Sequence, residues 1–122
     1  MYTMKKKCAV YCIANFIGKK WTLLILLELF KGKSEWKRFS ELKKRLLGIT
    51  PKILSLRLKE LIKENLVEKK IDTKNLPIQS RYSLTKRGRD FISIIKEIKI
   101  WSLKWKIKNE SCENRDCKAC LF

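Results

Sequence analysis

The sequence contains no histidine and few acidic residues, with 12 Asp+Glu against 30 Lys+Arg among 122 residues. Histidine is the side chain most often used for acid–base catalysis near neutral pH, and it is a frequent metal ligand. The sequence also has no glycine-rich phosphate-binding loop and no Ser/His/Asp set. We therefore do not expect an enzyme.

Long apolar runs are missing as well. The most apolar stretch, residues 21–30, is too short to span a bilayer and carries Glu28. The N-terminal apolar run follows three lysines, as in a signal peptide, but no small-residue cleavage site comes after it. We expect a cytoplasmic protein that has no membrane partner.

What the chain has in excess is positive charge. Its formal net charge is +18, which favours a polyanionic partner, and nucleic acid first among them. The alternative is a solvated, lysine-rich surface like those of thermophile proteins, although such surfaces usually balance lysine with glutamate. The length suits one domain with one core.

Residues 39–66 predict two helices joined by a tight turn at Gly48. Ser40 is the predicted N-cap of the first helix, which should run through Leu47. Thr50 and Pro51 supply an N-cap and a first-turn proline for the second helix. The apolar stripe of the second helix consists of Leu54, Leu58, Leu61 and Ile62. Its other side and flanks carry Lys52, Ser55, Leu56, Arg57, Lys59 and Lys63. A helix with a dry back and a basic front is what DNA recognition requires.

Around this pair, the pattern predicts a short helix over residues 8–17, closed by Gly18, and a buried helix over 21–30. Residues 33–38 should form a polar connection whose Trp36 packs on a neighbouring surface. Two strands, 66–71 and 81–84, enclose a loop over 72–80 and form a hairpin directly after the recognition helix. This arrangement is typical of a wing, and its candidate DNA contacts are Lys74, Gln79 and Arg81.

A long last helix should start at Thr85 and run to about Lys108. It carries a heptad-like seam made of Phe91, Ile94, Ile98, Trp101 and Trp105. A second apolar stripe consists of Ile92, Ile95 and Leu103. One stripe can cover the protein's own core, and the other predicts a two-fold dimer. We therefore divide the chain into a DNA-binding domain over residues 1–108, with dimerisation through about 85–108, and a cysteine-containing tail over 109–122.

Five cysteines leave three hypotheses open. Cys8 and Cys12 lie one helical turn apart, and the tail carries Cys112, Cys117 and Cys120. The tail spacing suits a zinc or iron–sulfur site but supplies only three ligands, so Cys8 or Cys12 would have to provide the fourth. Alternatively, the cysteines form disulfides and respond to redox state, or they are free thiols in a mobile tail and small core residues.

The ordered motifs resemble the HxlR family of winged-helix transcription regulators, which are related to the MarR type. The resemblance covers roughly residues 8–105. It is carried by Cys8 thirteen residues before Trp21, by Ile17-Gly18 and Lys20-Trp21, by Phe39-Ser40-Glu41-Leu42, by Gly48-Ile49, by the Leu54, Leu58, Leu61 spacing, by Leu66-Val67, by Pro77, and by Tyr82-Ser83-Leu84-Thr85 before Gly88. It implies a homodimer with a winged helix–turn–helix in each subunit, bound to palindromic operator DNA. It also makes Cys8 a candidate sensor of oxidants or electrophiles.

Some positions depart from the family pattern. Lys19 stands where the family has a second glycine, and the connection that holds Trp36 is longer than usual. In the wing, Gln79 replaces a frequent arginine and Arg81 replaces a glutamate. Replacing an acid by Arg81 should increase general affinity for DNA.

The sequence thus predicts an α+β, mainly α, winged helix–turn–helix protein whose long N- and C-terminal helices form a dimer interface. We expect a homodimeric regulator that binds double-stranded DNA. Lys52, Ser55, Leu56 and Lys59 should lie nearest the bases, with Arg57 on the flank. Thr50, Lys43, Lys44 and the wing residues should hold phosphates. The rival hypotheses are a sequence-tolerant architectural DNA-binding protein, a metal-sensing regulator, and a module that binds another protein.

Overall fold

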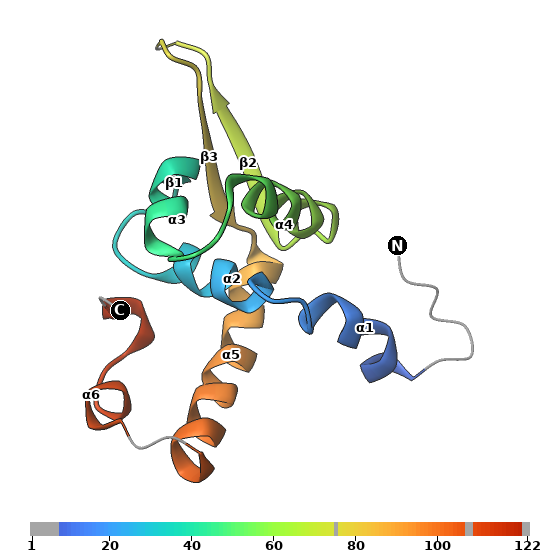
Figure 1. Cartoon of the computed structure of the whole chain (residues 1–122), viewed down its shortest axis with the longest axis vertical. Coiled ribbons are helices and arrows are strands. Elements are labelled where there is room, and N and C mark those ends of the chain that lie inside the picture. The colour runs from blue at the N-terminus through green and yellow to red at the C-terminus, as the bar shows by residue number, and fades with distance from the viewer. Residues whose placement is uncertain (1–7, 75, 107–108, 121–122) are drawn as a thin grey trace.

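The computed structural model describes residues 8–74, 76–106 and 109–120. Within these ranges, the helices and strands follow one another in the order α1 (Ala9–Ile17), α2 (Thr22–Phe30), β1 (Lys37–Arg38), α3 (Phe39–Arg45), α4 (Pro51–Lys63), β2 (Val67–Asp72), β3 (Gln79–Leu84), α5 (Lys86–Trp105) and α6 (Glu110–Glu113), with a final 3₁₀ turn, η1 (Cys117–Ala119). The strands form one antiparallel sheet in the order β1-β3-β2. The predicted α+β, mainly α, winged helix–turn–helix fold is confirmed (Figure 1).

Helix α2 is the centre of the core, as its apolar sequence predicts. It packs against α1, α3, α4, α5 and β3, and Ile25 and Leu26 are fully buried. Its one acidic residue, Glu28, is also buried. The Glu28 carboxylate pairs with Arg45 Nε at 2.9 Å and with Lys31 Nζ at 3.3 Å. Two cationic partners offset the cost of taking this carboxylate out of water.

The helix–turn–helix forms as its sequence predicts. Gly48 turns the chain with a φ of +93°, a conformation that glycine adopts without steric cost. Thr50 caps α4, and its Oγ1 accepts a hydrogen bond from the Ile53 N–H at 3.2 Å. Three residues of the predicted apolar stripe are buried: Leu54, Leu58 and Leu61. The buried stripe leaves the other side of α4 to solvent.

The predicted bounds of α3 were wrong at both ends. Ser40 lies inside the helix, and the N-cap residue is Arg38. Pairing with Arg81 in the sheet keeps Arg38 extended, and its N–H donates to the Glu41 carboxylate at 3.4 Å. The strand therefore fixes where the helix begins. The helix ends at Arg45 rather than at Leu47, which is exposed.

The wing spans the predicted residues, but its strands extend further into the loop than predicted. Both β2 and β3 extend into the predicted loop over 72–80, and Asp72 pairs with Gln79. The predicted connection over 33–38 contributes the two-residue strand β1, which pairs with β3. A two-residue strand shows no periodicity in a sequence, because its pairing with β3 alone defines it. Leu66 closes α4 instead of opening the strand, since its N–H donates to the Leu61 carbonyl.

Helix α5 starts at a tightly packed corner. Thr85 Oγ1 accepts from the Gly88 N–H at 3.1 Å and donates to the Asn65 carbonyl at 2.6 Å. A Cβ at position 88 would overlap the Leu66 carbonyl oxygen, so glycine is needed there. The helix is described to Trp105, and its predicted end near residue 108 lies outside the described residues.

The C-terminal tail, residues 109–120, is docked on the body. It lies on the opposite side of α5 from α1 (Figure 1). Lys118 Nζ donates to the Phe30 carbonyl at 2.7 Å, and the Lys118 carbonyl accepts from the Gly32 N–H at 2.9 Å. Lys99 Nζ donates to the Arg115 carbonyl at 2.6 Å. The tail therefore satisfies a terminal carbonyl of α2 with a cation, which a helix C-terminus favours.

None of the helices in the described part of the chain is both long and apolar enough to cross a membrane. Helices α1 and α2 reach the length and apolar composition of a membrane span only when they are taken together, and the chain bends by 77° between them.

Candidate nucleic-acid interface

The exposed side of α4 is the first part of the interface. Lys52 and Lys59 are exposed, and Leu56 is about half exposed between them. Thr50 stands at the start of the helix, where backbone N–H groups can meet phosphate. Lys44, on α3, is exposed, and Lys43 is half-buried. The exposed side chains among them are available to a ligand, and their contact with DNA stays a prediction.

Arg57, on the predicted flank of α4, also has partners within the protein. Its guanidinium donates to the Glu60 carboxylate at 3.0 Å and to the Lys20 carbonyl at 3.4 Å. The same carboxylate pairs with Lys19 Nζ at 2.6 Å. Arg57 thus ties α4 to the connection between α1 and α2. Lys19, which replaces a family glycine, gains its partner in this cluster.

The two cations around Glu60 lower the pKa of its carboxyl group. Partial burial alone would raise the pKa of the Glu60 carboxyl, but hydrogen bonds and charge from Lys19 and Arg57 outweigh it, so the pKa is lowered. Glu60 is therefore charged at neutral pH and holds both cations in place.

The three predicted DNA contacts of the wing lie in different surroundings. Gln79 shares a pocket of about 400 Å³ with Ser55 of α4 and with Ser80 and Tyr82 of β3. Arg81 lies in another pocket of about 360 Å³, with Trp36 and Lys70. Lys74 is exposed near the end of the hairpin, beside Asp72, whose carboxylate accepts its N–H at 3.0 Å. Only Gln79 is placed next to the recognition helix.

Helix α5 presents the predicted stripes to different surroundings. Ile92 and Ile95 are buried against the core, as expected for the inward stripe. Phe91 of the seam is half-buried and packs on the core. The rest of the seam is exposed: Ile94, Ile98, Trp101 and Trp105. Four large apolar side chains along one helix face form an apolar patch of the kind that marks an interaction site.

The cysteines do not meet in this structure. No disulfide joins any two of the five, all of which lie in the described ranges. Cys8 is exposed at the start of α1, where its Sγ accepts from the Tyr11 N–H at 3.3 Å, and Cys12 is buried. In the parts that the structure describes, no group of three or more Cys, Asp or Glu side chains is arranged to hold a metal ion. Since α1 and the tail lie on opposite sides of α5 (Figure 1), the predicted four-cysteine site is not preformed within one chain.

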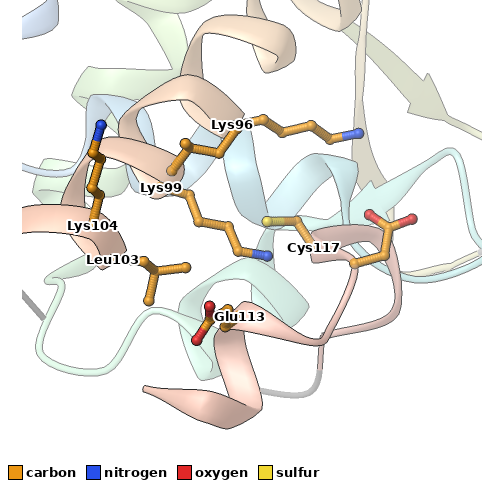
Figure 2. Close-up of a pocket in the computed structure, with 8 residues that line it drawn as sticks. Lys96, Lys99, Leu103, Lys104, Glu113 and Cys117 are labelled. Carbon is orange, nitrogen blue, oxygen red and sulfur yellow. The ribbon is translucent and has the colours of Figure 1, made fainter. Parts of the chain in front are cut away.

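The tail forms a feature that sequence patterns did not reveal. A pocket of about 620 Å³ lies between α5 and the tail, and three of the residues that line it are lysines: Lys96, Lys99 and Lys104. In Figure 2 the Cys117 thiol and the Lys99 ammonium point toward each other across it. Leu103, predicted as part of the inward stripe, also lines this pocket. The lysines recur at helical spacing, a signal that becomes meaningful only once the tail is known to cover them.

With this geometry in place, comparison with known proteins identifies the family. The model of the HxlR-like helix-turn-helix family matches residues 16–110. The chain belongs to the HxlR-like family. The transcriptional regulator YdeP of Bacillus subtilis is 34% identical over 106 residues, which cover 87% of this chain and 80% of YdeP. A regulator of Methanothermobacter thermautotrophicus is 34% identical over 94 residues, covering 77% of this chain and 69% of that protein.

Solved structures agree with this membership. Reduced YodB from B. subtilis superposes with a TM-score of 0.71 at 28% identity, covering 85% of this chain and 99% of YodB. The redox regulator HypR, in its oxidized form, superposes with a TM-score of 0.69 at 29% identity, covering 89% of this chain and 99% of HypR. This HxlR-family chain is a DNA-binding transcription regulator and not an enzyme, as the sequence predicts. The family match ends at residue 110, so most of the docked tail is outside it.

Proposed function

We propose that the protein acts as a homodimer on palindromic operator DNA. The single observation that carries this proposal is the exposed seam on α5, in the same chain as the exposed basic side of α4. A seam of this kind is apolar enough to be covered by its own copy, and a two-fold axis would then present two recognition helices to two half-sites. Half-sites one helical turn apart are the expected operator geometry.

On each half-site, α4 enters the major groove. Lys52, Ser55 and Lys59 read base edges or phosphates there, and Leu56 meets a thymine methyl. Thr50, Lys43 and Lys44 bind the phosphate backbone beside the groove. Gln79 extends this surface, since it shares a pocket with Ser55. Arg57 contributes indirectly, because its contacts with Glu60 and Lys20 hold α4 in place.

The regulator also responds to thiol chemistry in this proposal. Cys8 is exposed, so a small oxidant or electrophile can reach its sulfur. HypR is a redox regulator solved in oxidized and reduced forms, and YodB has been solved with a bound quinone. The signal would travel by a movement of α1 against α5, which changes the spacing of the two recognition helices. A zinc or iron–sulfur site at the cysteines stays a prediction, and it would need the tail to move or a second subunit to contribute.

The test is a footprint of the protein on the DNA upstream of its own gene, with reduced and oxidised protein in parallel. We expect a symmetric protected site for the reduced protein and a lost or shifted site after oxidation. Cys8→Ser is the matched control, because it keeps the size of the side chain and removes the thiol. A response to oxidation that persists in Cys8→Ser would contradict sensing by Cys8.

A sequence-tolerant architectural protein is the second candidate, and the net charge of +18 favours it. The same footprint separates the two functions. Uniform coating without a protected site, at any salt concentration, would support the architectural protein and contradict operator binding.

A further inference from the structure

One side of α5 carries three lysines interleaved with two apolar side chains. These residues recur at the spacing of a helix turn: Lys96, Lys99, Ile100, Leu103 and Lys104. At about 100° per residue, the five positions fall within about 140° of arc on one side of the helix. The tail lies over this side, and all five residues line the pocket of about 620 Å³ between α5 and the tail. The pocket therefore has a wall that is both cationic and apolar.

The charges of this wall have neutral partners. Lys99 Nζ donates to the Arg115 carbonyl at 2.6 Å. Lys96 Nζ lies 5.1 Å from the centre of the Phe30 ring, and Lys104 Nζ lies 5.2 Å from the indole ring of the next residue. Among the described residues, no salt bridge involves any of these three lysines. Because a carbonyl or a ring attracts an ammonium without cancelling its charge, all three can still attract an anion.

Two carboxylates line the tail side of the pocket and reduce its positive potential. Asp116 Oδ1 accepts from the Lys118 N–H at 3.2 Å and thereby caps the turn η1. Glu113, at the end of α6, lies below the Lys99 ammonium in Figure 2. Three lysines outnumber two carboxylates in the lining, so its charge favours an anion over a cation. An anion bound here would be repelled by Glu113.

The size and the lining of the pocket fit a small amphipathic molecule. Small-molecule sites usually have volumes of about 300–1,000 Å³ and combine apolar walls with a few polar groups. Ile100 is exposed and Leu103 is half-buried, so an apolar chain lying on them would remove both from water. Lysine ammoniums stand on flexible four-carbon stems and can turn toward a bound carboxylate.

We propose that this pocket between α5 and the tail binds an organic monocarboxylate with an aliphatic chain. The lysines bind the carboxylate, and the chain lies on Ile100 and Leu103. The pocket lies on the side of α5 opposite the exposed seam, and most of the tail is outside the family match, which ends at residue 110. Binding at this site therefore depends neither on the dimer nor on the operator.

Protection of the Cys117 thiol in the whole chain tests this proposal. Cys117 lines the pocket and is half-buried, so a bound ligand should slow its alkylation by iodoacetamide. Cys8 is the internal control, because it is exposed at the start of α1 and does not line the pocket. Octanoate is the probe, titrated at constant ionic strength, and mass spectrometry of peptides measures both rates. We expect octanoate to slow the reaction of Cys117 to a plateau and to leave the rate at Cys8 unchanged.

Three analogues test the chemistry of the ligand. Octanamide keeps the chain without the charge, acetate keeps the charge without the chain, and octylammonium reverses the charge. Each should need at least about fivefold more than octanoate for half-protection, because each lacks a part that the pocket binds. Equal protection by octanamide would overturn the proposal. So would no protection by octanoate, equal slowing at Cys8, or a faster reaction of Cys117, which would mean that the ligand displaces the tail.

Variants of the wall assign the binding to its charge. The double variant K96M/K104M removes two charges and keeps long side chains, so it should weaken octanoate about fivefold and leave octanamide unchanged. Lys86→Met is the matched control, since it makes the same change on α5 ten residues before Lys96, about 15 Å away along the helix. An unchanged K96M/K104M, or an equal loss in Lys86→Met, would overturn the proposal.

Glu113→Gln changes the binding in the opposite direction. It removes a carboxylate that repels the ligand, so octanoate should bind more tightly while octanamide stays unchanged. A gain of affinity cannot come from a misfolded variant, which makes this result independent of the stability of the tail. Weaker binding of octanoate by Glu113→Gln would contradict an anionic ligand.

Discussion

Replacing Trp101 by alanine should dissociate the proposed dimer. Trp101 is 56% exposed in the single chain. A tryptophan side chain buries roughly 200 Å², so about 110 Å² of Trp101 is left for a partner to cover. Two-fold symmetry doubles this to roughly 220 Å² per dimer. At about 25 cal/mol per Å², the ceiling on the loss is about 5.5 kcal/mol per dimer.

The measurable loss should be smaller than this ceiling. Neighbouring side chains relax around a truncated residue, and a partner seldom covers all of the exposed area. Taking half of the ceiling gives about 2.7 kcal/mol, which corresponds to a roughly hundredfold weaker dimer. Sedimentation equilibrium over a range of protein concentrations measures the dissociation constant directly.

The neighbouring residue supplies the control. Ile100 is 57% exposed, almost the same fraction as Trp101, but it lines the pocket between α5 and the tail instead of the seam. We expect Ile100→Ala to leave the dimer dissociation constant within about threefold, because it removes no seam contact. A parent protein that is monomeric at all concentrations would refute the reasoning. So would an Ile100→Ala variant that dissociates as strongly as Trp101→Ala.

Two further predictions concern stability. Gly88→Ala should lower the free energy of unfolding by about 1–3 kcal/mol, because its Cβ would overlap the Leu66 carbonyl. Gly32→Ala is the control, because its Cβ meets open space and costs only the strain of a positive φ. In urea unfolding, Gly88→Ala should lose more stability than Gly32→Ala. The reverse order would contradict the packing argument. Glu60→Gln should destabilise the protein at neutral pH. Because the folded pKa of Glu60 is lowered, the stability that its charge contributes is present above the ordinary value of 4.5 and is lost as the pH falls through the folded pKa. Thermal melts of both proteins should therefore converge on acidification, and a constant difference would exclude the charge as the cause.

The fold was largely predictable because its main signals are local. The cap at Thr50, the turn at Gly48 and the start of α5 next to Thr85 are where the sequence places them. Each depends on a few neighbouring residues, as N-caps and left-handed turns do. The stripe periodicity of α4 and α5 likewise needs only the residues of the helix itself.

The errors arise where distant segments decide the outcome. The start of α3 follows from the pairing of Arg38 with Arg81, which are 43 positions apart in the printed sequence. Arg57 pairs with Glu60 one turn along the same helix, but only the fold brings the Lys20 carbonyl to it. A sequence pattern alone predicts that such a residue faces solvent, whereas its hydrogen bonds show that it links two segments of the fold.

The position of the tail could not be predicted from the sequence either. Its polar composition and three cysteines indicate chemistry but give no docking surface. The hydrogen bonds from Lys118 and Lys99 place it against α2 and α5. The pairing of Arg38 with Arg81 was also hidden, because β1, which contains Arg38, has only two residues.

Helix α5 joins these features, because three of its faces meet three different surroundings. At about 100° per residue, Ile92 and Ile95 face the core, Ile98 and Trp101 lie roughly a third of a turn away on the seam, and the lysines of the tail pocket lie on the side opposite the seam. A dimer formed through the seam would therefore leave the tail pocket open on its outer side. The tail contacts α5 at Lys99 and the end of α2 at Phe30, so an event that moves the tail acts on both helices. In a dimer formed through the seam, a tilt of α5 would change the separation of the two recognition helices, whose half-sites tolerate little change in spacing.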